Sequence, residues 1–168
     1  MIEAQVVRDV CEHLTWRTIR LGLLKNANEY CKAMESANIQ IGHCAVGILD
    51  KPALTFAAKE TDVDLVVLSG AQLDFKKVAQ YGEICARALG FGLELCPAEV
   101  GPALRLAYKD QPPGGWLNIA MAPITNSDGI LRVFGLDTLG RQLWLSGFRG
   151  YPDYQWHPQY RFVFVRPR

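Results

Sequence analysis

The C-terminal stretch places the tightest constraint on the fold, because it combines two strand-like runs with an aromatic-rich segment between them. Residues 141–168 read RQLWLSGFRGYPDYQWHPQYRFVFVRPR. The runs at 141–145 and 161–165 have strand composition, and a loop of about 15 residues separates them. A flexible linker would be rich in Gly and Ser, and a disordered tail would lack aromatics. Rigid aromatic residues beside small polar ones are instead typical of a binding surface, and loops of this length are usually functional.

The residues before this stretch predict a mixed set of elements in a clear order. The apolar, β-branched run Asp64-Leu-Val-Val-Leu-Ser69 has the length of a buried strand. Asp74 is the expected N-cap of a helix that Gly90 ends. Turn residues at 126–129 and 138–140 predict two hairpins. The expected order is a strand at 64–69, helices at 75–89 and 97–108, strands at 116–121, 130–136 and 141–145, the long loop, and a closing strand at 161–165.

Residues 1–60 open with apolar side chains at spacings of three and four, from Val6 to Met34, which predicts a long helical pattern. Asn38 and Gly42 are the expected stop signals, and a short apolar segment follows at 44–49. We expect a helical support segment that either packs on the rest of the chain or mediates assembly. A chain of 168 residues is expected to hold one domain. With 1–60 as the support segment, residues 61–168 are the candidate ligand-display domain.

The order of elements in 61–168 resembles the C-type lectin fold. In that fold an early strand pairs with the final strand, while two helices and a central meander support a long loop region. Residues 141–166 further resemble the variable region of target proteins of diversity-generating retroelements. Those systems rewrite a terminal cassette by mutating adenines, chiefly in asparagine codons, on a C-type-lectin scaffold. The resemblance implies an α+β, C-type-lectin-like domain that displays a hypervariable region for protein–protein interaction.

The resemblance also implies a division of the cassette into variable and invariant positions. Trp and Gln cannot be reached from an AAC codon by changing adenines, so Trp144, Gln155, Trp156 and Gln159 would belong to an invariant frame. Trp156 is open to two interpretations, a scaffold anchor or a contact residue. In a competing interpretation, the tyrosines of the loop pack onto the sheet and shield its edge. The expected ligand-binding residues are Ser146, Phe148, Arg149, Tyr151, Asp153, Tyr154, Trp156, His157 and Tyr160.

Charge and composition restrict the class of partner. The formal net charge of +1 argues against nucleic acid as the main partner. From residue 141 onward, five arginines against one aspartate give a local charge of +4, which suits an acidic protein ligand. We see neither a secretory signal pattern nor an apolar run of the ~18–20 residues that a membrane span needs, so a cytoplasmic protein is expected. The five cysteines are odd in number and lack C-x-x-C spacing, which favours buried free thiols.

Patterns for catalysis and for metal binding are incomplete. His43-Cys44 lacks the ligand spacing of a zinc site, and Ser69 lacks the surrounding glycines of a nucleophile elbow. The calcium-dependent sugar site of C-type lectins uses tripeptides that Gln111-Pro-Pro113 and Trp116-Leu-Asn118 do not complete. The sequence therefore predicts no catalytic residues, no metal site and no cofactor.

The combined prediction is a non-enzymatic recognition protein whose partner is a macromolecule, expected to be a protein, with the oligomeric state left open. Two alternatives remain. One is a small α+β enzyme with a cleft between the N-terminal helices and the sheet, with His43 or Ser69 in its polar cluster. The other is a structural module that dimerises through the N-terminal helix.

Overall fold

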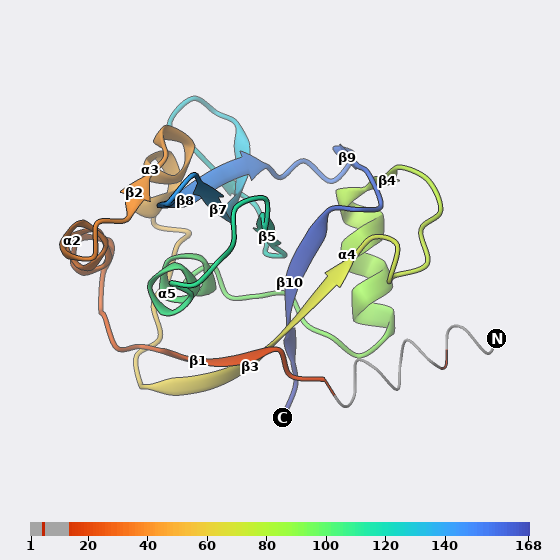
Figure 1. Cartoon of the computed structure of the whole chain (residues 1–168), viewed down its shortest axis with the longest axis horizontal. Helices are drawn as coiled ribbons and strands as arrows, with labels where there is room; N and C mark the ends of the chain where they lie inside the picture. Colours follow the sequence, from red (N-terminus) through yellow and green to blue (C-terminus); the bar gives the residue numbers. More distant parts are fainter. Residues whose placement is uncertain (1–4, 6–13) are drawn as a thin grey trace.

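The computed structural model describes residue 5 and residues 14–168 of the chain. The predicted α+β class is confirmed: helices surround a sheet that curls into a half-barrel (Figure 1). The elements follow the chain in the order β1 (Arg17–Leu21), α2 (Ala27–Ser36), β2 (Gln40–Ile41), α3 (His43–Leu49), β3 (Thr61–Ser69), β4 (Ala79–Gln80), α4 (Tyr81–Gly90), α5 (Val100–Ala107), β5 (Leu117–Ile119), β6 (Ile124–Thr125), β7 (Leu131–Leu139), β8 (Gln142–Arg149), β9 (Gln155–Trp156) and β10 (Arg161–Arg166).

The last strand of the chain lies inside the main sheet. The strand order is β1-β3-β10-β5-β7-β8-β2, with β6 paired to β7. β10 runs antiparallel to β3, with Arg161 opposite Ser69 and Arg166 opposite Asp64, and it runs parallel to β5. The expected pairing of an early strand with the closing strand is therefore confirmed. It brings the C-terminus beside β1 and β3 (Figure 1).

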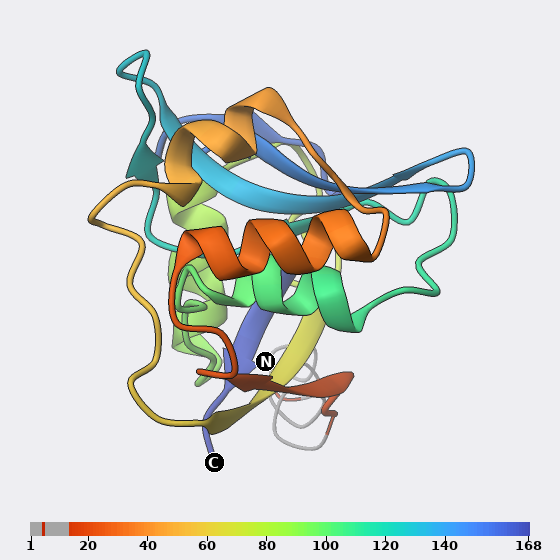
Figure 2. The ribbon, with the colours of Figure 1, turned by 90° about the vertical axis from the view of Figure 1, so that its left-hand side faces the viewer.

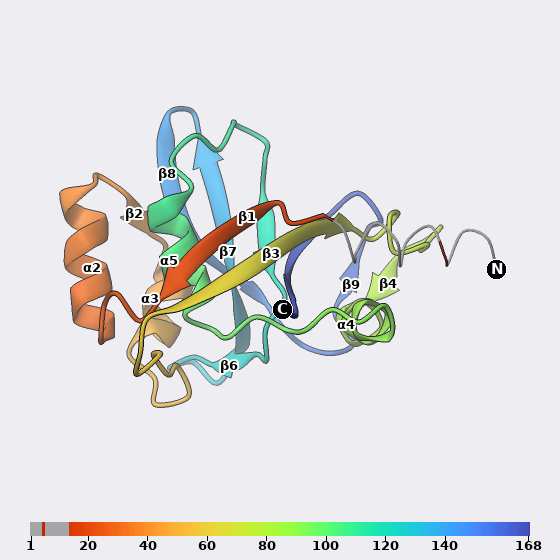
Figure 3. The ribbon, with the colours of Figure 1, turned by 90° about the horizontal axis from the view of Figure 1, so that it is seen from below.

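Helices cover β10 on both sides, which explains its unbroken apolar sequence. α4 and α5 lie on opposite sides of this strand (Figures 1 and 3). Phe162, Val163 and Phe164 are consequently all fully buried, as expected of a strand whose two faces are covered. The residues that α4 buries recur at helical spacings of three and four: Tyr81, Ile84, Cys85 and Ala88.

The first 60 residues contribute both edges of the same sheet. β1 pairs antiparallel with β3, and β2 pairs parallel with β8. α2 lies alongside α5, and α3 packs on the hairpin formed by β7 and β8 (Figure 2). A Cβ atom on Gly147 of β8 would lie 2.8 Å from the Cys44 carbonyl carbon, so a glycine here lets α3 approach the strand closely.

The helical pattern expected from Val6 to Met34 is wrong at residues 17–21, which form β1, and its residues 6–13 lie outside the described part. Ile19 and Leu21 are buried while Arg20 between them is exposed, which is the period of two of a strand with one face covered. The helix is confirmed from Ala27 to Ser36, where the Asn26 side chain accepts a hydrogen bond from Glu29 N at 2.9 Å.

The expected start of the next helix at Asp74 is also wrong, because α4 begins at Tyr81. Asp74 instead lies in a turn, with a φ of 66° and an ion pair to Lys76 at 2.9 Å. Gln80 is the true N-cap, and its backbone N donates to the Glu83 carboxylate at 2.9 Å as part of a capping box. α5 likewise begins at Val100, later than the expected residue 97.

The carboxylate of Asp64 links β1, β3 and β10 at the end of the sheet where the C-terminus lies. Asp64 accepts hydrogen bonds from Thr18 Oγ1 of β1 at 2.6 Å and from Arg168 Nε at 3.0 Å. Arg166 of β10 lies 3.6 Å away from the same carboxylate. The hydrogen bond from Arg168, followed by that from Thr18, lowers the pKa of the Asp64 carboxyl to about 2.

Acid should weaken the fold through Asp64. Its folded pKa of about 2 lies below the value of about 3.9 expected in the unfolded chain, so the stabilisation is present above the unfolded pKa and is lost as pH falls toward 2. We expect the difference in Tm between wild type and Asp64→Asn to be largest above about pH 5 and to vanish near pH 2. Calorimetry across this range measures it. Asp128→Asn, at an exposed turn residue, is the control, and an unchanging difference for Asp64→Asn would contradict the assignment.

A second carboxylate, that of Glu99 at the N-terminus of α5, is buried and links this helix to the N-terminal part of the chain. Glu99 is 1% exposed and accepts hydrogen bonds from Gly22 N at 2.9 Å, Tyr30 Oη at 2.7 Å and Ala57 N at 2.7 Å. Burial and then the bond to Glu99 raise the pKa of the Tyr30 hydroxyl well above its ordinary value, so it stays a donor. This carboxylate therefore joins three separate segments of the first 60 residues to the core.

Candidate ligand-binding site

The segment between β8 and β10 has more regular structure than the sequence predicted. β8 continues to Arg149, beyond the expected end at Leu145. Gln155–Trp156 forms β9, which pairs antiparallel with β4. The expected single loop of about 15 residues is therefore wrong, because short turns flank β9 instead. Local composition did not reveal β9, since its partner β4 lies far away in the sequence.

Backbone hydrogen bonds fasten these turns to the rest of the fold. Two of the donors are amides of the first turn of α4, which have no partner within their own helix. Two others follow β3 directly. The four bonds run from Tyr81 N to Tyr154 O (2.9 Å), from Gly82 N to Pro152 O (2.8 Å), from Gly70 N to Tyr160 O (3.1 Å) and from Ala71 N to Pro158 O (2.9 Å). The backbone of the segment is thus held at both ends by the core.

The nine residues expected to bind a ligand differ in exposure. Arg149, Asp153, Tyr154 and His157 are exposed, whereas Ser146, Phe148, Tyr151 and Tyr160 are half-buried. Trp156 is only 4% exposed, and its indole N–H is buried without a hydrogen-bond partner. Its burial agrees with the interpretation of Trp156 as a scaffold anchor. We refer to the other eight residues as the contact surface.

Part of the contact surface lines a pocket of about 310 Å³ beside a cluster of aromatic rings. Trp116 lies with its ring centroid 4.2 Å from that of Phe148 and 5.3 Å from that of Tyr160. Trp156 meets Tyr154 at 5.2 Å and Tyr160 at 5.1 Å, in both cases edge to face. Edge-to-face contacts of this kind stabilise each pair beyond the burial of their surfaces. The rings therefore fix one another's positions around the pocket.

A glycine on the neighbouring strand makes room for one of these rings. A Cβ atom on Gly135 of β7 would lie 1.9 Å from the Phe148 ring, so no other residue fits there unless Phe148 moves. The ring can lie across β7 and reach Trp116 only because this side chain is missing. Gly135 is consequently a structural requirement of the pocket that the sequence alone did not single out.

The position of Trp116 depends on a buried arginine. Arg105 of α5 donates to Gln111 Oε1 at 2.5 Å and to Trp144 O at 3.3 Å, and Gln111 Nε2 in turn donates to Gly115 O at 2.7 Å. Burial lowers the pKa of Arg105 to about 10. This network fixes the turn that precedes Trp116. Trp116, the first residue of the strand predicted at 116–121, is half-buried and lines the pocket.

Arg132 of β7 also lines the pocket, and sequence reasoning missed it. The sequence contained a pattern that could have identified Arg132, because the predicted turn at 138–140 fixes which residues of the two hairpin strands lie opposite each other. Leu139 pairs with Gln142, and counting back along both strands places Arg132 opposite Arg149. The predicted hairpin therefore implied two adjacent arginines at the start of the aromatic segment.

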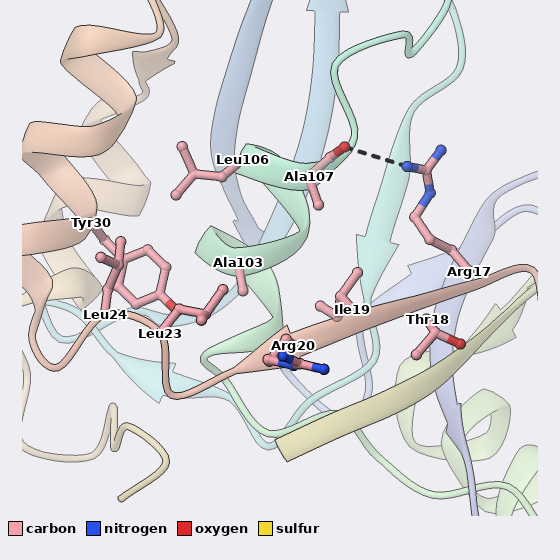
Figure 4. A pocket seen from close by; sticks show the side chains of 10 residues that line it. All are labelled: Arg17, Thr18, Ile19, Arg20, Leu23, Leu24, Tyr30, Ala103, Leu106 and Ala107. Carbon is pink, nitrogen blue, oxygen red and sulfur yellow. Dashed lines mark hydrogen bonds between the residues drawn. The ribbon is translucent and has the colours of Figure 1, made fainter. Parts of the chain in front are cut away.

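A second cavity, of about 350 Å³, lies where the alternative prediction placed an enzymatic cleft (Figure 4). Its walls come from β1, the turn after it, α2 and α5, and they are mainly apolar, with Leu23, Leu24 and Leu106 among them. Of the two arginines at this cavity, Arg17 donates to Ala107 O at 3.3 Å (Figure 4), and Arg20 pairs with Asp62 at 2.7 Å.

The two polar residues named for that alternative are not among those that line the cavity. Ser69 accepts a hydrogen bond from Gln72 N at 3.1 Å, as expected of a cap at the end of a strand. His43 is the first residue of α3.

Within residue 5 and residues 14–168, no three His, Cys, Asp or Glu side chains come together in a way that could hold a metal ion. Four cysteines in the described part are free thiols: Cys85 and Cys96 are buried, and Cys31 and Cys44 are half-buried. The fifth, Cys11, lies outside the described residues. None of the helices that the structure describes is both long and apolar enough to span a bilayer.

Comparison of the chain with protein-family models, with curated proteins and with solved structures found no match.

Proposed function

We propose that this chain is a non-enzymatic recognition protein that binds a macromolecular ligand, expected to be a protein, through the contact surface. The observation that carries the proposal is the contrast between a fixed backbone and outward side chains in residues 146–160. Four backbone hydrogen bonds and the buried Trp156 hold the segment, while Tyr154, Arg149 and His157 remain exposed around an aromatic pocket. Preorganised aromatic side chains lose little entropy on binding, which favours affinity.

We further propose that the scaffold is C-type-lectin-like and that the chain is a variable protein of a diversity-generating retroelement. Two features support this: the pairing of β3 with the closing strand β10, and the succession of two helices followed by the β5–β7–β8 meander. The invariant frame would consist of the residues that adenine changes in an AAC codon cannot produce: Trp144, Gln155, Trp156 and Gln159. The coding locus tests this directly. A near-copy of codons 141–168 with adenines at the contact positions, beside a reverse transcriptase gene, is expected, and a locus lacking both would contradict it.

Replacing Tyr151 and Tyr154 together by alanine tests the contact surface. We expect the Tm to stay within a few degrees of wild type, because Tyr154 is 37% exposed and Tyr151 half-buried. A partner isolated with the wild-type chain should bind the purified double variant at least about tenfold more weakly, since central aromatic residues dominate interface energies. Calorimetric titration of the purified partner measures the loss.

Leu139→Ala is the matched control, because Leu139 is 59% exposed at the opposite end of the β7–β8 hairpin. It should change neither the Tm nor the affinity. If the double variant and the wild type bound the partner equally well, the partner would bind another surface of the chain. If the Tm of the double variant fell by much more than a few degrees, the two tyrosines would belong to the core.

A further inference from the structure

We infer that the free edge of β1 binds an extended segment of a partner protein, in which an apolar and an acidic residue stand two positions apart. The apolar side chain enters the second cavity, and the acidic side chain meets Arg17. This site goes beyond the proposed function, because the residues of β1 and of the second cavity do not belong to the contact surface.

β1 lies at an open edge of the main sheet. It is the first strand in the strand order, and β3 is its one partner among the strands that the structure describes. In the described part of the chain, no main-chain hydrogen bond of a turn, loop or cap reaches residues 17–21. Alternate residues of an edge strand present unpaired N–H and C=O groups. Extended peptides bind such edges by adding a strand to the sheet.

The second cavity, of about 350 Å³, reaches this edge. Thr18 and Arg20 lie on one face of β1, where each donates a hydrogen bond to an aspartate of β3. Ile19 is buried on the other face, which α5 covers. All three line the cavity (Figure 4). Because β3 occupies one edge of β1, a cavity that is lined from both faces of the strand extends to the free edge.

An apolar side chain fits the part of the cavity beside Ile19. Leu24 and Leu106 line it, and Leu23, which also lines it, is 57% exposed (Figure 4). On an added strand, the residue opposite Ile19 would point to the same face and could cover these leucines. Gly22 N donates to a buried carboxylate at 2.9 Å, which fixes the turn that carries Leu23 and Leu24 before a ligand arrives.

Arg17 provides the complementary charge two residues before Ile19. It points toward α5, since Nη1 donates to Ala107 O at 3.3 Å. Its guanidinium carbon lies 5.2 Å from the ring centroid of Trp16 and 4.7 Å from that of Tyr108, contacts that orient the group. The ion pair of Arg17 with an 84% exposed carboxylate is 3.5 Å long and therefore weak. A guanidinium has five N–H donors, so Arg17 can bind a second carboxylate.

Charge also favours a partner protein over a second copy of this chain. β1 contains two arginines and no acidic residue, and none of the described residues that line the cavity is Asp or Glu. Two copies of β1 side by side would bring like charges together, which destabilises a sheet. A segment with an acidic residue opposite Arg17 replaces this repulsion by attraction.

Titration of the whole chain with the capped peptide TTETLTT, followed by NMR, tests the inference. Its glutamate and leucine stand two positions apart and therefore share one face of a strand. We expect saturable binding that slows hydrogen exchange of those amides in residues 17–21 that β3 leaves unpaired. The peptide TTELTTT has the same composition but puts the two side chains on opposite faces, so it should bind at least about tenfold more weakly.

Three variants separate the cavity from the charge. Ala107→Phe should weaken binding of TTETLTT about tenfold, because this exposed last residue of α5 lines the cavity. Ala86→Phe, at an exposed position of α4, is the matched control and should leave the affinity unchanged. Arg17→Gln should weaken binding of TTETLTT but not of TTTTLTT, which lacks the carboxylate. All three should keep a Tm within a few degrees of wild type.

Three results would overturn the inference. The first is equal affinity for TTETLTT and TTELTTT, or no saturable binding of either. The second is binding without slower exchange in residues 17–21, which would make the cavity a site for an apolar group alone. The third is a dimeric mass by light scattering with the same amides already protected, which would show that a second copy occupies the edge.

Discussion

Replacing Glu99 by alanine should lower the free energy of unfolding by about 3–5 kcal/mol, one of the largest effects expected in this chain. The carboxylate is 1% exposed and accepts three hydrogen bonds, from Gly22 N, Tyr30 Oη and Ala57 N. Alanine would leave these three donors without acceptors in a region that water reaches poorly. Each buried donor that loses its partner costs about 1–3 kcal/mol. Urea denaturation followed by circular dichroism measures the change.

The expected loss is large compared with the total stability of domains of this size, about 5–15 kcal/mol. The variant should therefore be partly unfolded near body temperature, with the N-terminal elements released first. Glu35→Ala is the matched control, because Glu35 is exposed on α2 and its loss should cost less than about 0.5 kcal/mol. A Glu99 variant as stable as the Glu35 variant would show that the buried carboxylate does not hold the N-terminal segment.

Replacing Trp156 by alanine should cost about 3–5 kcal/mol, although this residue lies in the middle of the proposed binding segment. Its side chain is 4% exposed and packs against Trp116, Tyr160 and Phe162, with the last centroid 5.6 Å away. Removing the indole would leave a cavity that the surrounding rings cannot fill without moving. Thermal denaturation measured by calorimetry gives the loss of stability.

Tyr154→Ala provides the comparison, since Tyr154 lies two residues earlier and contacts the same indole from an exposed position. It should lower the Tm by no more than a few degrees. The ratio of the two effects tests the division between frame and contact surface. If both variants lost the same small amount, Trp156 would not be an anchor, and the fixed backbone on which the proposed function depends would be in doubt.

Much of the scaffold could be predicted because its signals are local. Leu65 to Leu68 are all apolar, as expected of the part of β3 that lies between β1 and β10. The turn at 138–140 produced the expected β7–β8 hairpin, with Gly140 at a φ of +61°. Residues 161–165 formed the closing strand almost to the residue. In each case a few neighbouring residues contain the whole pattern.

The errors arose where a distant partner decided the local structure. The apolar spacing around Ile19 suits a helix as well as a strand, and only the pairing with β3 makes it β1. Gln155–Trp156 looked like loop because its partner, Ala79–Gln80, also had no strand pattern of its own. Two-residue strands of this kind have almost no intrinsic preference and form only when the rest of the fold brings them together.

The candidate site shows the same difference between features that are local in the sequence and features that depend on distant segments. The sequence identified the residues of the contact surface as a cluster, because they are contiguous in the chain and have an unusual composition. It did not determine that Trp156 turns inward, nor that Trp116 of the β5 region reaches the pocket. The direction of a side chain depends on which surfaces are covered, and helix α4 and strand β10 cover this one from elsewhere in the chain.

By itself, then, the sequence determined the order of most strands and helices from β3 onward, the β7–β8 register and the place of the polar-aromatic segment. Only the tertiary structure decided that β1 is a strand, that Trp156 anchors the segment and that Trp116 lines the aromatic pocket. The physical reason is the range of the interactions involved. Turn chemistry and hydrophobic periodicity act over a few residues, whereas burial and strand pairing depend on segments that meet only when the whole chain has folded.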